Sequence, residues 1–279
     1  MFGLKHIIIL IFCVAACVCG AIFLRKLKLK TWYRILLFVG IVSETVKIVY
    51  YVRANEGVYG GYLPKTDLPF QLCSIQLLFI ALLNFTKSEK LHRFLLAFML
   101  PTCLIGGAAA ILIPTSSSLS AWPITFQYFI YHSVIITFAV YLFGCREIKW
   151  EIGDYFNALK MLALMAFIAV YLNSMFFDLG GYEKIDGVEQ VVFARRVNFM
   201  YVVDPPASGL PLLNKDHGWL VYIINYAWIA VTALTLCYIK PVVKAIAAKI
   251  SRKDRLAEKA ENEAESDSSV TEETPENKQ

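Results

Sequence analysis

A cysteine in one apolar segment and a histidine in another are the residues of this sequence best suited to chemistry. Cys73 lies in the stretch Leu68–Leu78, which opens an apolar segment yet also carries a hydroxyl and two amides. His132 lies well inside a later apolar segment. A thiolate is a strong nucleophile, and a nearby imidazole can take the proton from the thiol near neutral pH. The two side chains therefore predict a nucleophile and a base that could form an acyl thioester.

Further polar groups fall at similar predicted depths. Glu44 and Lys47 are three residues apart, so they share one face of a helix. Charges in hydrocarbon are costly and face a partner or a polar cavity, which leaves two readings, an ion pair that fixes packing or a part of a site. A rise of about 1.5 Å per residue puts these groups, Asn173 and the Cys–His pair in the outer half of the membrane. We expect a polar cavity there, with substrate-binding residues Glu44, Lys47, Gln71 and Asn173.

The composition requires these residues to be positioned by membrane-spanning helices. The chain is 58% hydrophobic and 18% charged, with a mean hydropathy of +0.56. Soluble domains are about 45–50% apolar and about 25% charged. A helix that crosses the hydrocarbon needs about 20 mostly apolar residues, and seven segments fit this length. They are His6–Leu24, Trp32–Tyr51, Pro69–Phe85, Phe94–Ile113, Trp122–Phe143, Tyr155–Phe177 and Trp219–Ile239. The fold class that we predict is an all-α polytopic bundle of about seven transmembrane helices.

The distribution of lysine and arginine predicts the orientation of the bundle, because cytoplasmic connections are enriched in both. The richer set is Arg25, Lys26, Lys28, Lys30, Arg34, Lys87, Lys90, Arg93, Arg146, Lys149, Lys160, Lys240, Lys244, Lys249, Arg252, Lys253 and Arg255. The poorer set is Lys5, Arg53, Lys65, Lys184, Arg195, Arg196 and Lys215. We therefore expect the N-terminus outside, the C-terminus in the cytoplasm and a multi-pass protein of the plasma membrane.

The chain divides into a membrane domain, residues 1–255, and an acidic tail, residues 256–279. The first segment could also be read as a lipoprotein signal ending near Cys17, but cleavage there would leave a basic stretch outside, so we expect a retained anchor. The long external loop, residues 178–218, contains the apolar stretch Val188–Val203, part of which should fold back onto the bundle. The tail has almost no apolar residues and is expected to be disordered in the cytoplasm.

Several classes of protein are disfavoured. The seven cysteines are odd in number and lie mostly in apolar runs, which argues against a disulfide framework, and no CxxC pair suggests a metal site. No nucleic-acid-binding motif is present. We expect no metal, no other cofactor and no nucleic-acid partner.

Three short motifs carry a resemblance to a known family. They are Leu68–Ser74, Tyr131–Ser133 and the stretch Asn198–Tyr201. With these motifs the chain resembles the YwaF-like integral membrane family, over roughly residues 30–240. That family is similar to eukaryotic transmembrane acyltransferases that remodel ether phospholipids, and more distantly to androgen-induced-gene hydrolases of fatty acid esters. The resemblance implies a Cys nucleophile at Cys73, a His at His132 and a substrate-binding Asn at Asn198, with phospholipids or acyl lipids as partners.

Three functions follow from these observations. The first is an acyltransferase or lipid acyl hydrolase that uses Cys73 and His132. The second is a transporter of ions or small molecules that uses Glu44, Lys47 and His132 as a polar path. The third is a membrane partner protein without catalytic activity, acting through the loop 178–218.

Overall fold

The computed structural model describes residues 3–59, 61–115, 117–119, 121–145, 147–177, 181–185, 188–192, 197–206, 210 and 212–271. Arg146, Arg195 and Arg196, which the charge distribution uses, lie outside this range, as do residues 272–279 of the tail. The longer helices are α1 (Leu4–Phe23), α2 (Leu29–Ala54), α4 (Leu72–Phe85), α5 (Glu89–Pro101), α7 (Trp122–Gly144), α8 (Ile152–Met175), α9 (Trp219–Cys237) and α10 (Ile239–Thr271).

Shorter elements connect these helices. They are α3 (Glu56–Tyr59), η1 (Lys65–Asp67), the π-helical turn η2 (Thr102–Gly106), α6 (Gly107–Leu112), η3 (Ser117–Leu119) and η4 (Phe199–Tyr201). The strands β1 (Gly181–Ile185) and β2 (Val188–Val192) form an antiparallel hairpin in the loop between α8 and α9, with Gly181 opposite Val192.

The predicted all-α polytopic membrane fold is confirmed. Within the described chain, six helical segments are long and apolar enough to cross a membrane: α1, α2, α5 together with η2 and α6, α7, α8 and α9. The predicted third span, Pro69–Phe85, is the shorter helix α4 of 14 residues. The backbone is extended at Gln71 before α4 and again at Thr86 after it, so the helix cannot continue in either direction.

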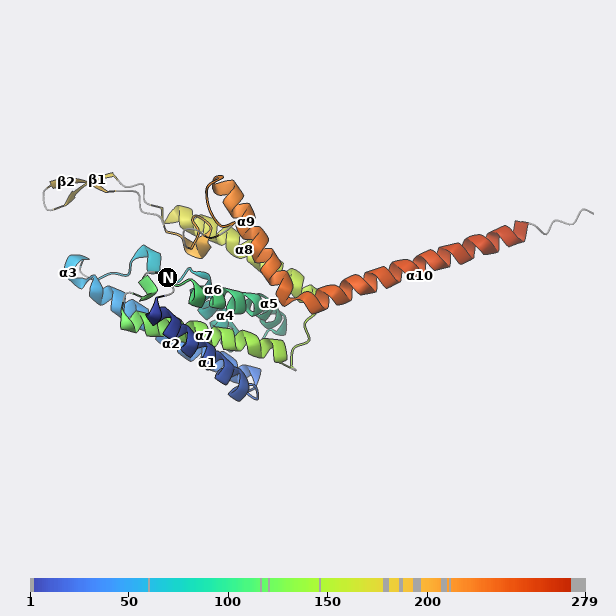
Figure 1. The fold of residues 1–279 in the computed structure, drawn as a ribbon, viewed down its shortest axis with the longest axis horizontal. Helices are drawn as coiled ribbons and strands as arrows, with labels where there is room; N and C mark the ends of the chain where they lie inside the picture. The colour runs from blue at the N-terminus through green and yellow to red at the C-terminus, as the bar shows by residue number, and fades with distance from the viewer. Residues whose placement is uncertain are drawn as a thin grey trace, which may run out of the picture.

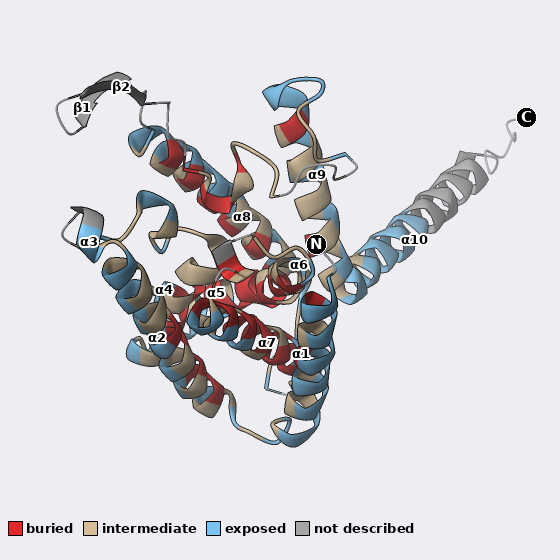
Figure 2. Ribbon diagram, turned by 60° about the vertical axis from the view of Figure 1, so that its left-hand side comes forward, coloured by how far each residue is buried: buried red, intermediate tan, exposed pale blue. Residues whose placement is uncertain are grey.

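The helix α7 lies at the centre of the larger part of the bundle. It packs against α1 and α2 on two sides and against η2 and α6 on a third (Figure 1). Buried residues are accordingly frequent on α7 and on α5, whereas α1 and the part of α10 up to Leu256 are largely exposed (Figure 2). The helix α5 also packs against α8 and α9, so it joins this group to the remaining helices.

A proline interrupts the hydrogen bonding of α5 where the π-helical turn begins. Pro101 has no N–H, so the carbonyl of Ala97 one turn earlier has no donor within the helix. The hydroxyl of Tyr238, which lies between α9 and α10, donates to that carbonyl over 2.7 Å. The hydroxyl of Thr102 donates to the carbonyl of Phe98 over 2.7 Å. The span therefore continues past Pro101, with the freed carbonyl of Ala97 bonded to Tyr238.

A bidentate ion pair joins α5 to α8 at the end that carries most of the positive charge. The guanidinium of Arg93 donates from Nε and Nη2 to the two carboxylate oxygens of Asp154, over 2.7 and 2.8 Å. The same carboxylate accepts from the backbone N–H of Glu151 in a capping box that starts α8. Paired N–H donors suit a carboxylate in both geometry and charge, so this contact fixes the start of α8.

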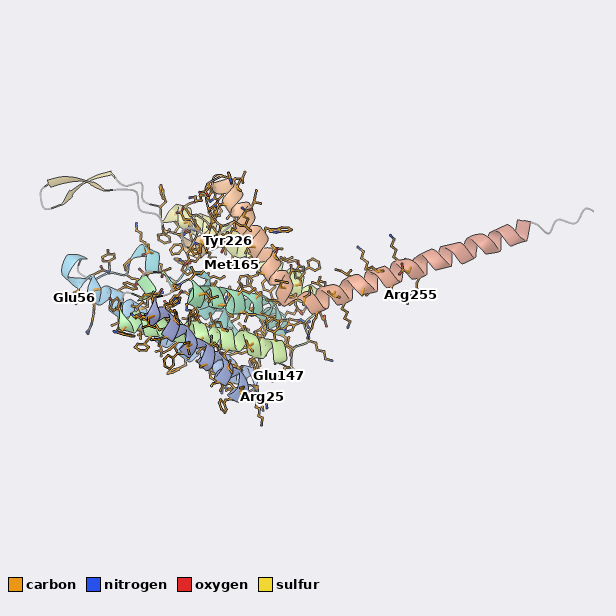
Figure 3. All side chains as sticks on the ribbon, viewed as in Figure 1. Arg25, Glu56, Glu147, Met165, Tyr226 and Arg255 are labelled. Atoms are coloured by element: carbon orange, nitrogen blue, oxygen red, sulfur yellow. The ribbon has the colours of Figure 1, made fainter. Side chains whose placement is uncertain are left out.

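The ends of the helices alternate as a multi-spanning chain requires. Arg25 and Glu147, in the connections after α1 and α7, lie at one end of the molecule, and Glu56 lies at the opposite end (Figure 3). Which end faces the cytoplasm stays a prediction from the charges. The helix α10 continues to Thr271, into the segment that the composition predicts to be disordered, and that prediction also stays open.

Candidate functional site

Cys73 is the second residue of α4, at a helix end whose amides are not capped by a side chain. Gln71 occupies the N-cap position but makes no capping bond to α4. The first N–H groups of a helix have no partner inside the helix and carry a partial positive charge. A thiolate or an oxyanion at Cys73 would therefore lie beside favourable backbone donors.

A polar network from α2 and α7 surrounds the same turn of α4. The hydroxyl of Tyr131 donates to the carbonyl of Cys73 over 2.8 Å. The hydroxyl of Ser74 donates to Glu44 over 2.9 Å, and Glu44 pairs with Lys47 over 2.7 Å. The carboxylate of Glu44 and the ammonium of Lys47 therefore lie beside the turn of α4 that carries Cys73.

His132 is buried in α7 with one ring nitrogen left without a partner. Its Nδ1 lies 2.6 Å from the carbonyl of Tyr128, one turn earlier, and the two rings are 4.2 Å apart. The side chain is 2% exposed, and Nε2 has no hydrogen-bond partner among the described residues. A buried polar atom left unpaired is costly, so this nitrogen marks a place where a ligand or water would be favoured.

The structure does not join Cys73 and His132 by a direct hydrogen bond. The imidazole Nε2 has no partner in the described chain, and Nδ1 is occupied by the carbonyl of Tyr128. Tyr131 of α7 connects the two residues indirectly. Its hydroxyl donates to the backbone carbonyl of Cys73, and its ring centroid lies 5.7 Å from that of His132. Proton transfer needs hydrogen-bond reach or a bridging water, so the two side chains make no direct transfer in this arrangement.

The remaining predicted amides all hold one loop, residues 198–204, which we call the 198–204 loop. Gln71 donates to the carbonyl of Asn198 over 3.1 Å and accepts from the N–H of Met200 over 3.0 Å. Asn173 donates to the carbonyl of Phe199 over 3.0 Å and accepts from its N–H over 2.8 Å. Asn198 closes the loop on itself through the N–H and carbonyl of Asp204, over 3.2 and 2.7 Å.

Side chains from α9 hold the other carbonyls of this loop. The hydroxyl of Tyr222 donates to the carbonyl of Tyr201, and the hydroxyl of Tyr226 donates to that of Met200 over 2.9 Å. The indole of Trp219 donates to the carbonyl of Val202 over 3.0 Å. Val202, like Phe199 and Met200, is buried, which confirms that part of the predicted stretch Val188–Val203 folds back onto the bundle.

The anchoring of the 198–204 loop supports an uncommon backbone conformation. Met200 and Tyr201 both have a φ of 55°, in the left-handed region that side chains other than glycine rarely adopt. Such residues cost on the order of 1–3 kcal/mol each and persist only where the surroundings hold them. Here the surroundings are the side chain of Gln71, just before α4, and side chains of α8 and α9.

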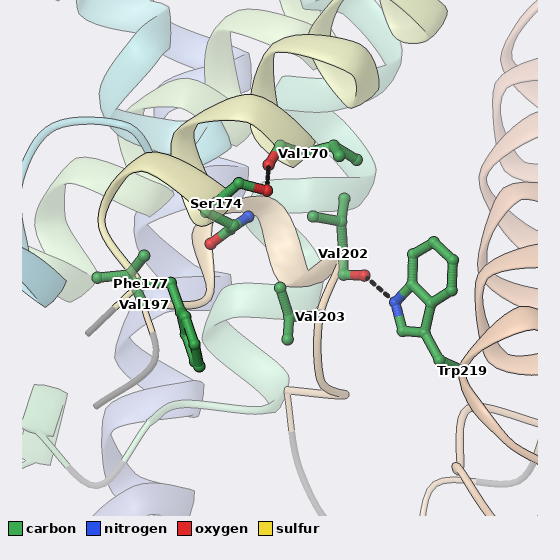
Figure 4. A pocket seen from close by; sticks show the side chains of 8 residues that line it. Val170, Ser174, Phe177, Val197, Val202, Val203 and Trp219 are labelled. Atoms are coloured by element: carbon green, nitrogen blue, oxygen red, sulfur yellow. Dashed lines mark hydrogen bonds between the residues drawn. The ribbon is translucent and has the colours of Figure 1, made fainter. Parts of the chain in front are cut away.

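An apolar hollow of about 400 Å³ lies on the other side of this loop, between α8 and α9 (Figure 4). Its lining residues are Val170, Asn173, Ser174, Phe177, Val197, Val202, Val203 and Trp219. The polar groups on its wall are already bonded, since Ser174 donates to the carbonyl of Val170 and Trp219 to that of Val202. A second hollow of about 550 Å³ lies between α2 and the start of α7. Neither is lined by Cys73 or His132.

The predicted site residues thus form two connected groups. Glu44, Lys47 and Cys73 gather on α2 and α4, while Gln71, Asn173 and Asn198 hold the 198–204 loop. The amides are engaged in bonds to protein backbone, and a substrate-binding role for them stays a prediction. Tyr128, Tyr131 and Tyr201 have no signal of their own in the sequence. The Tyr131–Ser133 and Asn198–Tyr201 motifs were the only signals that contained two of them.

The fold and the site define a polytopic α-helical membrane protein with a buried polar interior near Cys73. The chain matches the TMEM164 family over residues 1–238 and belongs to that family. The match supports the expectation of a multi-spanning membrane family, but it does not extend to the YwaF-like name or to the ether-lipid acyltransferases. No curated protein and no solved structure matches the chain.

Proposed function

We propose that this protein is a membrane-embedded enzyme of acyl transfer, with Cys73 as nucleophile and His132 as base. The observation that supports it best is the place of Cys73 at the uncapped N-terminus of α4, in an interior that also holds the unpaired nitrogen of His132. Backbone N–H groups at such an end can stabilise the negative oxygen that develops on an attacked acyl carbonyl.

The proposed reaction starts with attack of Cys73 on an ester of a membrane lipid. The thiol proton passes to Nε2 of His132, through a bridging water or hydroxyl. A bond forms between Sγ and the acyl carbon, the ester C–O bond breaks, and the imidazolium gives its proton to the departing alkoxide. The hydroxyl of a lysolipid, or water, then attacks the thioester by the reverse sequence and releases the thiol.

The expected substrates are phospholipids or other acyl lipids of the plasma membrane. The resemblance of the three motifs to lipid-remodelling acyltransferases favours this class, and the apolar hollow between α8 and α9 could hold a hydrocarbon chain. Glu44 and Lys47 form a direct ion pair, and the carboxylate of Glu44 also accepts a hydrogen bond from the hydroxyl of Ser74. Because both charges are already paired, these contacts favour the packing role over a path for transported ions.

Acyl labelling tests the proposal. Cells are fed an alkyne fatty acid, and the purified wild-type, Cys73→Ala, His132→Gln and Cys237→Ala proteins are compared before and after neutral hydroxylamine. We expect a hydroxylamine-labile label that is lost in Cys73→Ala, reduced in His132→Gln and kept in Cys237→Ala, which changes a cysteine of α9. A label that persists in Cys73→Ala would indicate lipidation elsewhere. Solute flux that depends on Glu44 and Lys47 would instead favour transport.

A further inference from the structure

The helix α10 carries a row of large apolar side chains that the described chain leaves half exposed. Ile239, Val243, Ile246 and Ile250 recur every three or four residues, so they share one side of the helix, which we call the apolar stripe. Each of the four is between 48% and 56% exposed. The side chains around Arg255, further along α10, project away from the bundle (Figure 3). The stripe is therefore open to a surface about 16 Å long, at a rise of about 1.5 Å per residue.

Basic side chains flank the apolar stripe. All of them are exposed, and they are Lys240, Lys244, Lys249, Arg252, Lys253 and Arg255. At about 100° per residue, Lys240 falls on one side of the stripe and Lys249 on the other. Among the side chains that the structure describes, none of these basic groups forms an ion pair. Such a helix offers apolar groups to hydrocarbon and free cations to anionic head groups at the same time.

The connection to α9 places the start of α10 at a membrane surface. The helix α9 is long and apolar enough to cross a membrane, and it ends at Cys237. Tyr238 is the one residue between α9 and α10, and its backbone departs from helical angles with a φ of −105° and a ψ of 19°. The chain changes direction there, and α10 leaves at an angle to α9 (Figure 1). The charge distribution predicts that this is the cytoplasmic surface, which is the one rich in anionic lipids.

We propose that α10, from Ile239 to Leu256, binds the anionic lipid surface beside α9. The apolar stripe lies between the lipid head groups, and the basic side chains contact their phosphates and carboxylates. Charge identifies this occupant, because the segment holds six basic residues and one acidic residue, Asp254. A second copy of α10 would instead bring like charges together. The acidic tail that follows is repelled by the same surface, which sets the end of the bound segment near Leu256. This binding is independent of the chemistry proposed at Cys73.

The test is hydrogen–deuterium exchange of the full-length protein in nanodiscs of phosphatidylcholine, with and without phosphatidylserine. Two triple variants remove equal charge at the same end of the bundle: Lys244→Gln, Lys249→Gln and Arg252→Gln in α10, and Arg25→Gln, Lys26→Gln and Lys28→Gln after α1 as the matched control. Each Lys or Arg beside an anionic surface favours the bound state by roughly fivefold, so the loss of three weakens binding roughly 100-fold.

We expect phosphatidylserine to slow exchange of the α10 amides up to Leu256 by about tenfold or more, in the wild type and in the control variant. The α10 variant should show no such effect, and high salt should abolish it in the wild type because it screens the charges. Equal exchange in the two kinds of nanodisc, or the same result for both triple variants, would overturn the proposal. Slow exchange of α10 whatever the lipid charge would indicate a protein contact instead, and would also overturn it.

A further variant tests the apolar stripe with every charge kept in place. Ile246→Ala together with Ile250→Ala removes two of its four side chains, while alanine raises the helix propensity of α10. A loss of protection in this variant cannot therefore come from a weaker helix. We expect it to lose most of the protection that phosphatidylserine gives the wild type, because less apolar area enters the head-group layer. Full protection in this double variant would contradict insertion of the stripe.

Discussion

Asn173→Ala should release the 198–204 loop from α8. The amide of Asn173 satisfies both backbone groups of Phe199, accepting from its N–H over 2.8 Å and donating to its carbonyl over 3.0 Å. Phe199 is fully buried, so water cannot readily replace these bonds. A buried backbone group that loses its partner costs about 1–3 kcal/mol, and two such groups therefore cost about 2–6 kcal/mol.

This cost falls on a loop that already holds strain. Met200 and Tyr201 favour a return to ordinary backbone angles once the anchors weaken. Since about 1.4 kcal/mol corresponds to a factor of ten, the lower bound of about 2 kcal/mol predicts local opening about 30-fold more often. The N–H groups of Met200, Val203 and Asp204, which bond to side-chain oxygens, report this opening by hydrogen exchange.

The assay is hydrogen–deuterium exchange of the purified protein in nanodiscs. Asn84→Ala is the matched control, because its amide also donates two bonds to backbone, to the carbonyls of Tyr33 and Ile80, near the other end of α4. We expect exchange in the 198–204 loop to rise about 30-fold or more in Asn173→Ala and to stay within about twofold of wild type in Asn84→Ala. Unchanged exchange in Asn173→Ala, or an equal rise in both variants, would refute the reasoning.

Three further changes have defined outcomes. Asp154→Asn breaks the bidentate pair with the half-exposed Arg93 and should lower the free energy of unfolding in mixed micelles by at most about 3 kcal/mol; no loss would contradict a structural role. Burial raises the pKa of Asp67, so the stability linked to its proton is present below about pH 4 and lost as the pH rises through the raised pKa. Asp67→Asn should flatten this dependence in melting curves across that range, and an unchanged slope would count against it. Gly107→Leu would bring a Cβ within 2.8 Å of an α7 side chain and should cost about 1–3 kcal/mol, whereas Gly144→Leu, with open space around it, should cost little.

The helices of this fold are predictable because the membrane leaves the backbone few choices. Long apolar runs must bond internally, so their composition alone identifies six of the spans. The helix α4 is short because the backbone is extended at Gln71 and at Thr86. The apolar sequence around these residues gives no sign of either end. The π-helical turn after Pro101 was not predicted either, because a proline in an apolar run marks a kink without specifying how the backbone resolves it.

The candidate site is less predictable because its contacts join distant parts of the chain. The pairing of Glu44 with Lys47 follows from helical spacing, but the bond from Ser74 depends on the register of α2 against α4. The left-handed pair Met200 and Tyr201 carries no glycine that would mark it in the sequence. Its conformation is imposed by partners far away in the chain, and local propensity gives no sign of it.

The hydroxyl of Tyr238 has a mechanical consequence. It donates to the carbonyl of Ala97, which Pro101 leaves without a backbone donor in the middle of a span. Tyr238 is also the last residue before the basic helix α10. The carbonyl of Tyr238 in turn accepts the N–H of Val242 in the first turn of α10. A force on α10, from a lipid head group or a partner, would therefore be transmitted through Tyr238 to the turn of α5 that precedes Pro101.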